Sequence, residues 1–281
     1  MSTQYRYPHF RRKILLEDMA FRGGPAPGRP MPDFDLPTTD GGRIRKGDFV
    51  GRRPLLLTLA SITCPMALSD VPELKRLHVR FGDRVEFVTL YVREAHPGER
   101  YPQPDTIERK LAHATAYKER ARIPWTVAVD DIEGELHRAL DPRPHAAYLM
   151  DTDGTVAFRA LNSNQERVLR KGIEDALFRQ PPGLGENRSR AVPLAKGLGS
   201  MCEALDLAGK EAKRDIRREL GPVYLMAVLA GALRPLPPLG RGIAASAITS
   251  IGVMAACWRL LWLLRWGAWP RVARRAVPRR S

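Results

Sequence analysis

A cysteine between a predicted strand and a predicted helix is the first residue of this sequence that could perform chemistry. Cys64 follows the apolar run 55–60 and precedes Pro65, which suits the first turn of a helix. Amides and the positive dipole end at a helix start stabilise a thiolate, the nucleophilic form of cysteine. Ser61 and Thr63 place hydroxyl groups beside the sulfur. We therefore predict a reactive thiol with a pKa below about 8.5, rather than an inert buried cysteine.

Two further polar residues follow the second apolar run, VEFVTLYV at 85–92. Glu94 and His96 are two positions apart, so in a continued strand their side chains point to the same side. The carboxyl ends of parallel strands share one rim of the sheet, which places both residues near Cys64. Imidazole is a common proton donor near neutral pH, and a neighbouring carboxylate sets its tautomer and charge. Without the cysteine, a solvated strand end would be the better interpretation.

The elements that must position these residues alternate between strand and helix. After a Gly- and Pro-rich entry at 23–30 and a short hairpin around Asp40-Gly41-Gly42, apolar runs of strand length alternate with amphipathic stretches. The predicted elements are strands at 55–60, 85–92, 125–129, 146–150 and 155–158, and helices after 65, at 105–122, around 136 and at 165–178. This order predicts an α/β fold, a thioredoxin-like mixed sheet with helices on both faces and an inserted segment at 93–125.

Charge and composition divide the chain further. Its net charge of +15 is concentrated after Asn187, where 17 Lys and Arg accompany only 5 Asp and Glu. We predict a loose leader at 1–22, the thioredoxin-like domain at 23–180, a linker with an amphipathic helix at 181–220, and an apolar, basic extension at 221–281. The acidic loop at 130–133 is interpreted as helix capping, not as a metal site.

The extension predicts contact with a membrane. Residues 242–264 carry one charge, Arg259, and are long enough to span a hydrocarbon core of about 30 Å. The four tryptophans between 258 and 269 fit a membrane interface better than nucleic acid, so no nucleic-acid partner is expected. Three arrangements stay open: a re-entrant hairpin formed with residues 221–233, an interfacial helix pair, and a packed helical subdomain.

The cysteine content indicates a reducing compartment. Cys64, Cys202 and Cys257 are too few and too scattered for a disulfide framework or a zinc site, so no metal is expected. The first 20 residues contain no apolar stretch of signal-peptide length. We therefore expect the domain to be cytoplasmic and membrane-associated through residues 221–281.

Two motifs in this order resemble the iodothyronine deiodinase family. Ser61-Ile-Thr-Cys64-Pro is similar to its Ser-x-Thr-selenocysteine-Pro motif, and the segment Tyr91-Val-Arg-Glu-Ala-His96 to its Tyr-Ile-x-Glu-Ala-His motif. The resemblance covers about residues 23–178. It implies that Cys64 takes the halogen of an aromatic substrate, that His113 contacts the substrate, and that the proton-handling network consists of Ser61, Thr63, Tyr91, Glu94 and His96.

This sequence departs from the family at the reactive atom, because Cys64 replaces selenocysteine. Ile62 stands where some deiodinases carry a resolving cysteine, and no other cysteine lies in the domain. An external thiol reductant is therefore implied, with no bound cofactor, unless Cys202 folds back. The substrate is expected to be a small molecule: an iodothyronine, another halogenated aromatic or a peroxide. A homodimer stays open.

Two other functions fit parts of the sequence. Peroxiredoxins share the fold and place Ser or Thr three residues before a Cys-Pro pair, which favours a one-cysteine hydroperoxide reductase as the alternative. However, Leu57 replaces their proline, and His145 stands near the position of their arginine, with Arg143 close by. The third function is a non-catalytic, membrane-tethered binding module, for which Cys64 would be unreactive.

Overall fold

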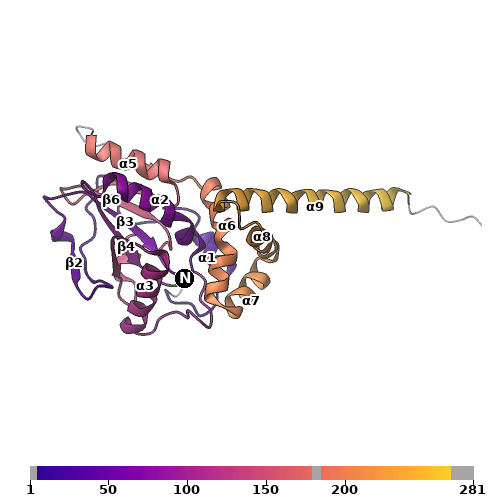
Figure 1. The fold of residues 1–281 in the computed structure, drawn as a ribbon, viewed down its shortest axis with the longest axis horizontal. Helices are drawn as coiled ribbons and strands as arrows, with labels where there is room; N and C mark the ends of the chain where they lie inside the picture. Colours follow the sequence, from indigo (N-terminus) through magenta and orange to yellow (C-terminus); the bar gives the residue numbers. More distant parts are fainter. Residues whose placement is uncertain (1–4, 179–184, 267–281) are drawn as a thin grey trace, which may run out of the picture. The chain divides into compact units, whose positions relative to one another are not determined.

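The computed structural model describes residues 5–178 and 185–266, with one six-stranded mixed sheet at its centre (Figure 1). The sheet has the order β5-β4-β3-β6-β7-β8. Its strands are β3 (Leu55–Ala60), β4 (Glu86–Tyr91), β5 (Thr126–Val129), β6 (Ala147–Met150), β7 (Val156–Ala160) and β8 (Gly185–Asn187). A separate hairpin consists of β1 (Asp35–Pro37) and β2 (Arg43–Arg45), followed by the short helix η1 (Lys46–Asp48).

The order and direction of the strands confirm the predicted fold. β3 pairs in parallel with β4 and antiparallel with β6, and β6 pairs antiparallel with β7. The helices α2 (Pro65–Phe81), α3 (Ile107–Ala121), α4 (Glu135–Ala139) and α5 (Glu166–Phe178) alternate with these strands. A βαβ unit joined to a ββα unit, with its first strand central, is the thioredoxin arrangement. Strand β5 is an additional parallel edge next to β4.

Alternating side chains of the central strands form two buried layers, which explains their unbroken apolar runs. On one face, Leu56 and Phe87 pack with residues of α2, α3 and α5, including Leu74, Tyr117 and Ile173. On the other face, the remaining strand residues pack with α4 and with the N-terminal hairpin segment. Helices therefore lie on both faces, as predicted.

The N-terminal segment is not the loose leader that its composition suggested. The side chains of Tyr5, Tyr7 and Phe10 are buried, and α1 (Arg12–Glu17) follows them. The hydroxyl of Tyr7 donates to the carbonyl of Ala95 at 3.1 Å. The aromatic rings supply enough apolar surface to fold the segment onto the domain, which the polar residues between them conceal in the sequence.

The segment predicted as a linker with one amphipathic helix also differs. It contains β8 and two helices, α6 (Ala191–Ala208) and α7 (Lys210–Glu219). The predicted helix breaks at Gly209, whose φ is 113°. The carboxylate of Glu99 accepts hydrogen bonds from the amides of Lys210 and Glu211 at the start of α7. A side chain at Gly209 would collide with that carboxylate, so the break is fixed by a residue more than 100 positions away.

The two apolar runs of the extension form separate helices with different surroundings. α8 (Gly221–Ala232) packs on α6 and α7, and its Ala227 and Ala230 are buried. By its contacts it belongs to the first of two compact units, residues 1–245 and 246–281, and the predicted membrane hairpin with residues 242–264 stays a prediction. α9 (Pro238–Trp266) contains one stretch, Pro238–Leu264, that is long and apolar enough to cross a membrane, with a mean hydropathy of 1.7. The basic tail after it lies outside the described residues.

The packed leader yields a stability prediction. Replacing Phe10 with Ala should lower the free energy of unfolding by about 3–5 kcal/mol, because a buried ring is lost and a cavity remains. The matched control is Leu16→Ala on α1, where the side chain is 62% exposed, and its effect should stay within about 0.5 kcal/mol. Denaturant unfolding of the two variants and the wild type measures both values. Equal, small effects would show that the segment is loose after all.

Candidate functional site

Cys64 lies where the sequence placed it, at the junction of β3 and α2. It is the residue that precedes the first turn of α2, its backbone is extended, and Pro65 opens the helix. Its side chain is only 1% exposed. The amides of Met66 and Ala67 face the sulfur and favour the thiolate. This part of the predicted arrangement is present in the structure.

The predicted depression of the thiol pKa is wrong. Burial raises the pKa of Cys64 to about 12, because the charged thiolate loses its hydration. The two helix amides lower the pKa, but by less than the burial raises it, and the carboxyl groups of Asp70 and Asp18 raise it further. The sequence showed the helix start but not the depth at which it lies. The resting form of Cys64 is the neutral thiol.

Glu94 is the centre of a buried hydrogen-bond network. It is fully buried, and its Oε2 accepts a hydrogen bond from the hydroxyl of Thr63 at 2.6 Å. Its Oε1 accepts one from the hydroxyl of Tyr91 at 2.5 Å. The Nδ1 of His113 lies 3.0 Å from the same Oε1. The network thus joins the loop before α2, the end of β4 and the middle of α3.

Two hydroxyl groups expected beside the sulfur serve the backbone of the facing segment. The Ser61 Oγ accepts a hydrogen bond from the amide of Ala95 at 3.2 Å. The Thr63 Oγ1 accepts one from the amide of His96 at 3.2 Å. These bonds hold residues 94–96 against the loop that carries Cys64.

The prediction that the side chains of Glu94 and His96 point to the same side is wrong. Strand β4 ends at Tyr91, so the alternation of side chains stops before these two residues. The carboxyl group of Glu94 points into the network, whereas the ring of His96 stacks on Phe10 with centroids 4.7 Å apart. Glu94 therefore acts on the segment that carries His96, not on its imidazole ring.

The imidazole of His96 is neutral at physiological pH. Burial lowers its pKa to about 4, and a smaller decrease comes from the nearby ring of His145. Its side chain is 7% exposed, and its Nδ1 is buried with no hydrogen-bond partner in the described part of the chain. The thiol of Cys64 and the imidazole of His96 are thus an uncharged acid and an uncharged base, and both are buried.

A cavity of about 330 Å³ connects these two residues. Its lining includes Cys64, His96 and His145, together with Phe10, whose ring packs against that of His96. Most of the remaining lining is apolar and comes from the N-terminal segment, α6 and α8: Leu15, Met19, Leu194, Leu198, Met201, Val223 and Met226. A largely apolar cavity with a few polar groups is the usual form of a small-molecule site.

His113, the expected substrate contact, lies beside Glu94. Its ring packs against Tyr101 and faces Glu94, and it is not among the residues that line the cavity. The expected contact between His113 and a substrate stays a prediction.

Three polar residues of the cavity lining were not among the predicted site residues. His145 and Asn162 lie in the loops before β6 and after β7, and Asp18 follows α1. Burial raises the pKa of Asp18 to about 7 and lowers that of His145 to about 4. The start of an antiparallel strand lies at the same edge of the sheet as the carboxyl end of its neighbour. This geometry could have indicated His145, which lies just before β6, the strand antiparallel to β3. Asp18 had no such signal.

Two other predictions concern residues outside the cavity. Cys202 is on α6 but lines a separate hollow with Glu203 and Asp206, so it does not face Cys64. Arg143 is buried on Asp141 and on the carbonyl of Glu17, away from the cavity lining.

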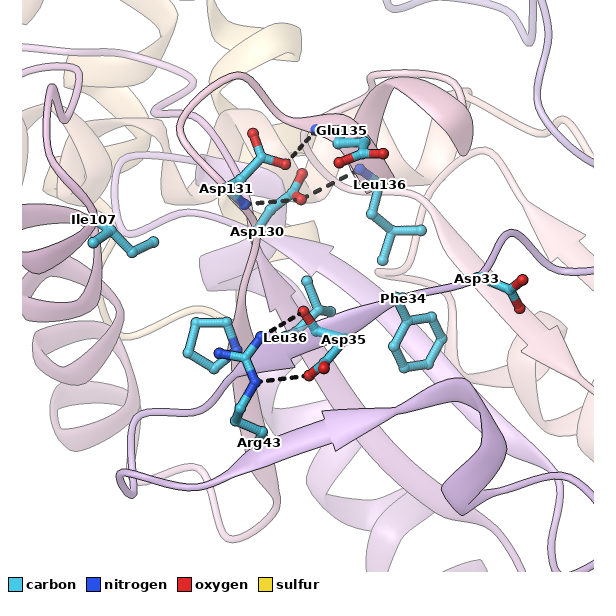
Figure 2. A pocket seen from close by; sticks show the side chains of 11 residues that line it. Asp33, Phe34, Asp35, Leu36, Arg43, Ile107, Asp130, Asp131, Glu135 and Leu136 are labelled. Atoms are coloured by element: carbon cyan, nitrogen blue, oxygen red, sulfur yellow. Dashed lines mark hydrogen bonds and ion pairs between the residues drawn. The ribbon is translucent and has the colours of Figure 1, made fainter.

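Figure 2 shows a larger hollow, of about 620 Å³, beside β1 and the loop after β5. The aspartates that line it form hydrogen bonds and ion pairs within the fold. Asp130 and Asp131 accept hydrogen bonds from amides at and before the start of α4, as the capping interpretation predicted. Asp35 binds the guanidinium of Arg43. No cysteine lines this hollow, whereas Cys64 lines the cavity of about 330 Å³.

The topology and the cysteine position define a thioredoxin-fold protein with one buried thiol at the start of its first core helix. The family model for iodothyronine deiodinase matches residues 9–152, just over half of the chain. The chain belongs to the iodothyronine deiodinase family.

Individual relatives agree with this assignment. A thyroxine 5-deiodinase of Gallus gallus is 35% identical over 80 residues, which cover 28% of this chain and 31% of the relative. A type I iodothyronine deiodinase of Xenopus laevis is 31% identical over 98 residues, covering 34% and 37%. The alignments thus span about a third of each relative's length. A thiol-disulfide oxidoreductase from Bacteroides fragilis overlaps 53% of this chain and all of its own, with 19% identity and a TM-score of 0.41.

The raised pKa of Cys64 gives a prediction for its alkylation. In a chain with Cys202→Ser and Cys257→Ser, the rate with iodoacetamide should rise about tenfold per pH unit from pH 7 to 10, because only the thiolate reacts. The thiolate fraction keeps rising until the pH passes the folded pKa of about 12, so no plateau should appear in this range. The urea-unfolded chain is the control and should level off near pH 8.5. A plateau below pH 8.5 in the folded chain would contradict the burial argument.

Proposed function

We propose that this protein is a thiol-dependent oxidoreductase that removes a halogen from an aromatic small molecule bound in the cavity beside Cys64. The observation that carries the proposal is the shared burial of a neutral thiol and a neutral imidazole on one wall of an apolar cavity. Membership of the deiodinase family supports the reaction type. Cys64 is the proposed nucleophile and His96 the proposed proton carrier.

The protonation states fit the balance of this reaction. The thiol proton of Cys64 passes to the imidazole of His96, which leaves a thiolate next to an imidazolium. Each charge offsets the desolvation of the other, although neither would form alone in the cavity. The thiolate sulfur takes the halogen from the ring carbon, and the imidazolium returns the proton to that carbon. The products are the dehalogenated ring and a sulfenyl halide, and the site needs no proton from water.

Recovery of the thiol requires an external reductant. One thiol displaces halide from the sulfenyl halide and forms a mixed disulfide with Cys64, and a second thiol releases Cys64. Because Cys202 lines a separate hollow, we propose small external thiols or a dithiol for both steps. No cofactor is needed for this balance.

The Glu94 network acts as a positioning device in this proposal. The hydroxyl of Thr63 donates a hydrogen bond to the carboxyl group of Glu94 and accepts one from the backbone amide of His96. Thr63 thus connects the carboxyl group to the backbone that carries the imidazole. The hydroxyl of Tyr91 donates a hydrogen bond to Glu94 and accepts one from the backbone amide of Ile62, two residues before Cys64. Losing the carboxyl group would loosen both reacting groups together.

The first test is the release of iodide from an iodinated phenol with dithiothreitol as reductant. Cys64→Ser should abolish it, and His96→Ala should reduce turnover about 10²–10⁴-fold, the usual contribution of a general acid. Glu94→Gln should have a smaller effect, because it keeps part of the network. The control is His9→Ala, an exposed imidazole that should leave turnover unchanged. Unchanged turnover in His96→Ala would refute the proposed role.

A parallel assay separates dehalogenation from peroxide reduction. The same protein and reductant are supplied with hydrogen peroxide in place of the iodophenol. Rapid consumption of peroxide without iodide release from the phenol would replace our proposal with the peroxiredoxin-like function. Absence of both reactions in a folded chain whose Cys64 also resists alkylation would favour a binding module.

We also propose that α9 attaches the domain to the cytoplasmic side of a membrane. Its stretch Pro238–Leu264 has the length and hydropathy for this role, and Arg259 near its end can extend towards headgroups. The full chain should stay in the membrane fraction at high salt, and a chain ending at Ala245 should be soluble. Release of the full chain at alkaline pH would indicate a helix lying in the interface, and retention a crossing helix. Recovery of the full chain in the soluble fraction at low salt would refute the attachment.

A further inference from the structure

His145 is a second imidazole on the cavity wall that the proposed mechanism leaves unused. It lies in the loop before β6 and is 9% exposed. Its Nδ1 is buried and, within residues 5–178 and 185–266, has no hydrogen-bond partner. A buried polar atom without a partner is energetically unfavourable, so such an atom on a cavity wall indicates a partner that arrives with the ligand.

The neighbours of His145 determine which proton its ring carries. Its Nε2 lies 2.8 Å from the Oδ1 of Asn162. The amide nitrogen of Asn162 donates to the carbonyl of Ser189 at 2.8 Å. Since a carbonyl only accepts, the NH₂ group of Asn162 must face Ser189, and its oxygen must face the imidazole. The proton is therefore on Nε2, and Nδ1 presents a lone pair.

The cavity around this lone pair restricts the chemistry of the ligand. Most of its lining is apolar, and the other polar groups on its wall are those of Asp18, Cys64, His96, Asn162 and Arg190. A buried acceptor in such surroundings fits an uncharged donor on a largely apolar molecule. A hydroxyl group on a ring meets both requirements, whereas an ammonium group would be costly to desolvate.

We propose that His145 is a ligand-binding residue whose Nδ1 accepts the hydroxyl hydrogen of an aromatic alcohol in the cavity, with Asn162 fixing its tautomer. This inference rests on the proposed function only in placing the substrate in this cavity. It assigns the recognition of the ring hydroxyl to the loop before β6, and Asn162 is a positioning residue that acts through His145.

The test uses two probes without a halogen, so that binding is measured without turnover. 2,6-Dimethylphenol and its methyl ether have the same ring, but only the phenol can donate a hydrogen bond. Each is titrated against the full chain, and its affinity is read from the protection of Cys64 against iodoacetamide. The quantity compared is the ratio of the two affinities, each corrected for the separately measured partitioning of that probe into detergent.

The wild type should bind the phenol at least about fivefold more tightly than the ether, as expected for one net hydrogen bond. His145→Leu should reduce the ratio to about one without weakening the ether. His145→Gln, which keeps an acceptor, should retain part of the preference, and Asn162→Leu should lose most of it. Asp18 is the rival hydrogen-bond acceptor on the cavity wall, and Asp18→Asn should keep the ratio of the wild type because His145 accepts the hydroxyl hydrogen.

Three results would overturn the proposal. The first is a wild-type ratio near one, which needs no variant and does not depend on folding. The second is a full preference in a folded His145→Leu chain, and the third is loss of the preference in Asp18→Asn but not in His145→Leu. A wild type that prefers the phenol but releases no iodide from an iodophenol would refute the proposed function and leave the role of His145 supported.

Discussion

The buried carboxyl group of Glu94 is the interaction on which the rest of the site depends. A carboxylate without water is tolerated only when hydrogen-bond donors replace its hydration. Here two donors and a third partner come from elements far apart in the sequence: the hydroxyls of Thr63 before α2 and Tyr91 at the end of β4 donate, and the ring of His113 on α3 completes the network. Satisfying one carboxyl group therefore fixes the loop of Cys64 relative to the end of β4 and to α3. The segment of His96 is held by the same contacts.

Desolvation gives the site its second property. The same burial that raises the pKa of Cys64 lowers that of His96, so the resting pair is uncharged in spite of its acid-base chemistry. In the proposed mechanism a thiolate and an imidazolium form together, and an apolar ligand would strengthen their attraction by excluding water. The proposed nucleophile would thus be held as a neutral thiol and activated by the transfer of one proton to His96.

The cavity draws on two parts of the chain. The thiol, His96 and Phe10 lie inside the region that matches the family model, residues 9–152. Much of its apolar lining comes from α6 and α8, which lie outside that region. The proposed chemistry thus belongs to the matched region, while helices beyond it help to set the shape of the cavity. α8 is followed directly by α9, so the wall of the cavity and the proposed membrane helix are neighbours in the chain.

The sequence alone determined the thioredoxin-like order of elements, since buried strands, amphipathic helices and hairpin turns are local patterns. It also placed Cys64 at the start of a helix and showed the motifs that define the family. Only the tertiary structure decided how deeply the thiol is buried, which reversed the predicted direction of its pKa shift. It also decided the split at Gly209, the packing of residues 5–17 and the place of His145 on the cavity wall. The reason is the same in each case: burial and capping are set by partners distant in the chain, and no periodicity or spacing within a segment records them.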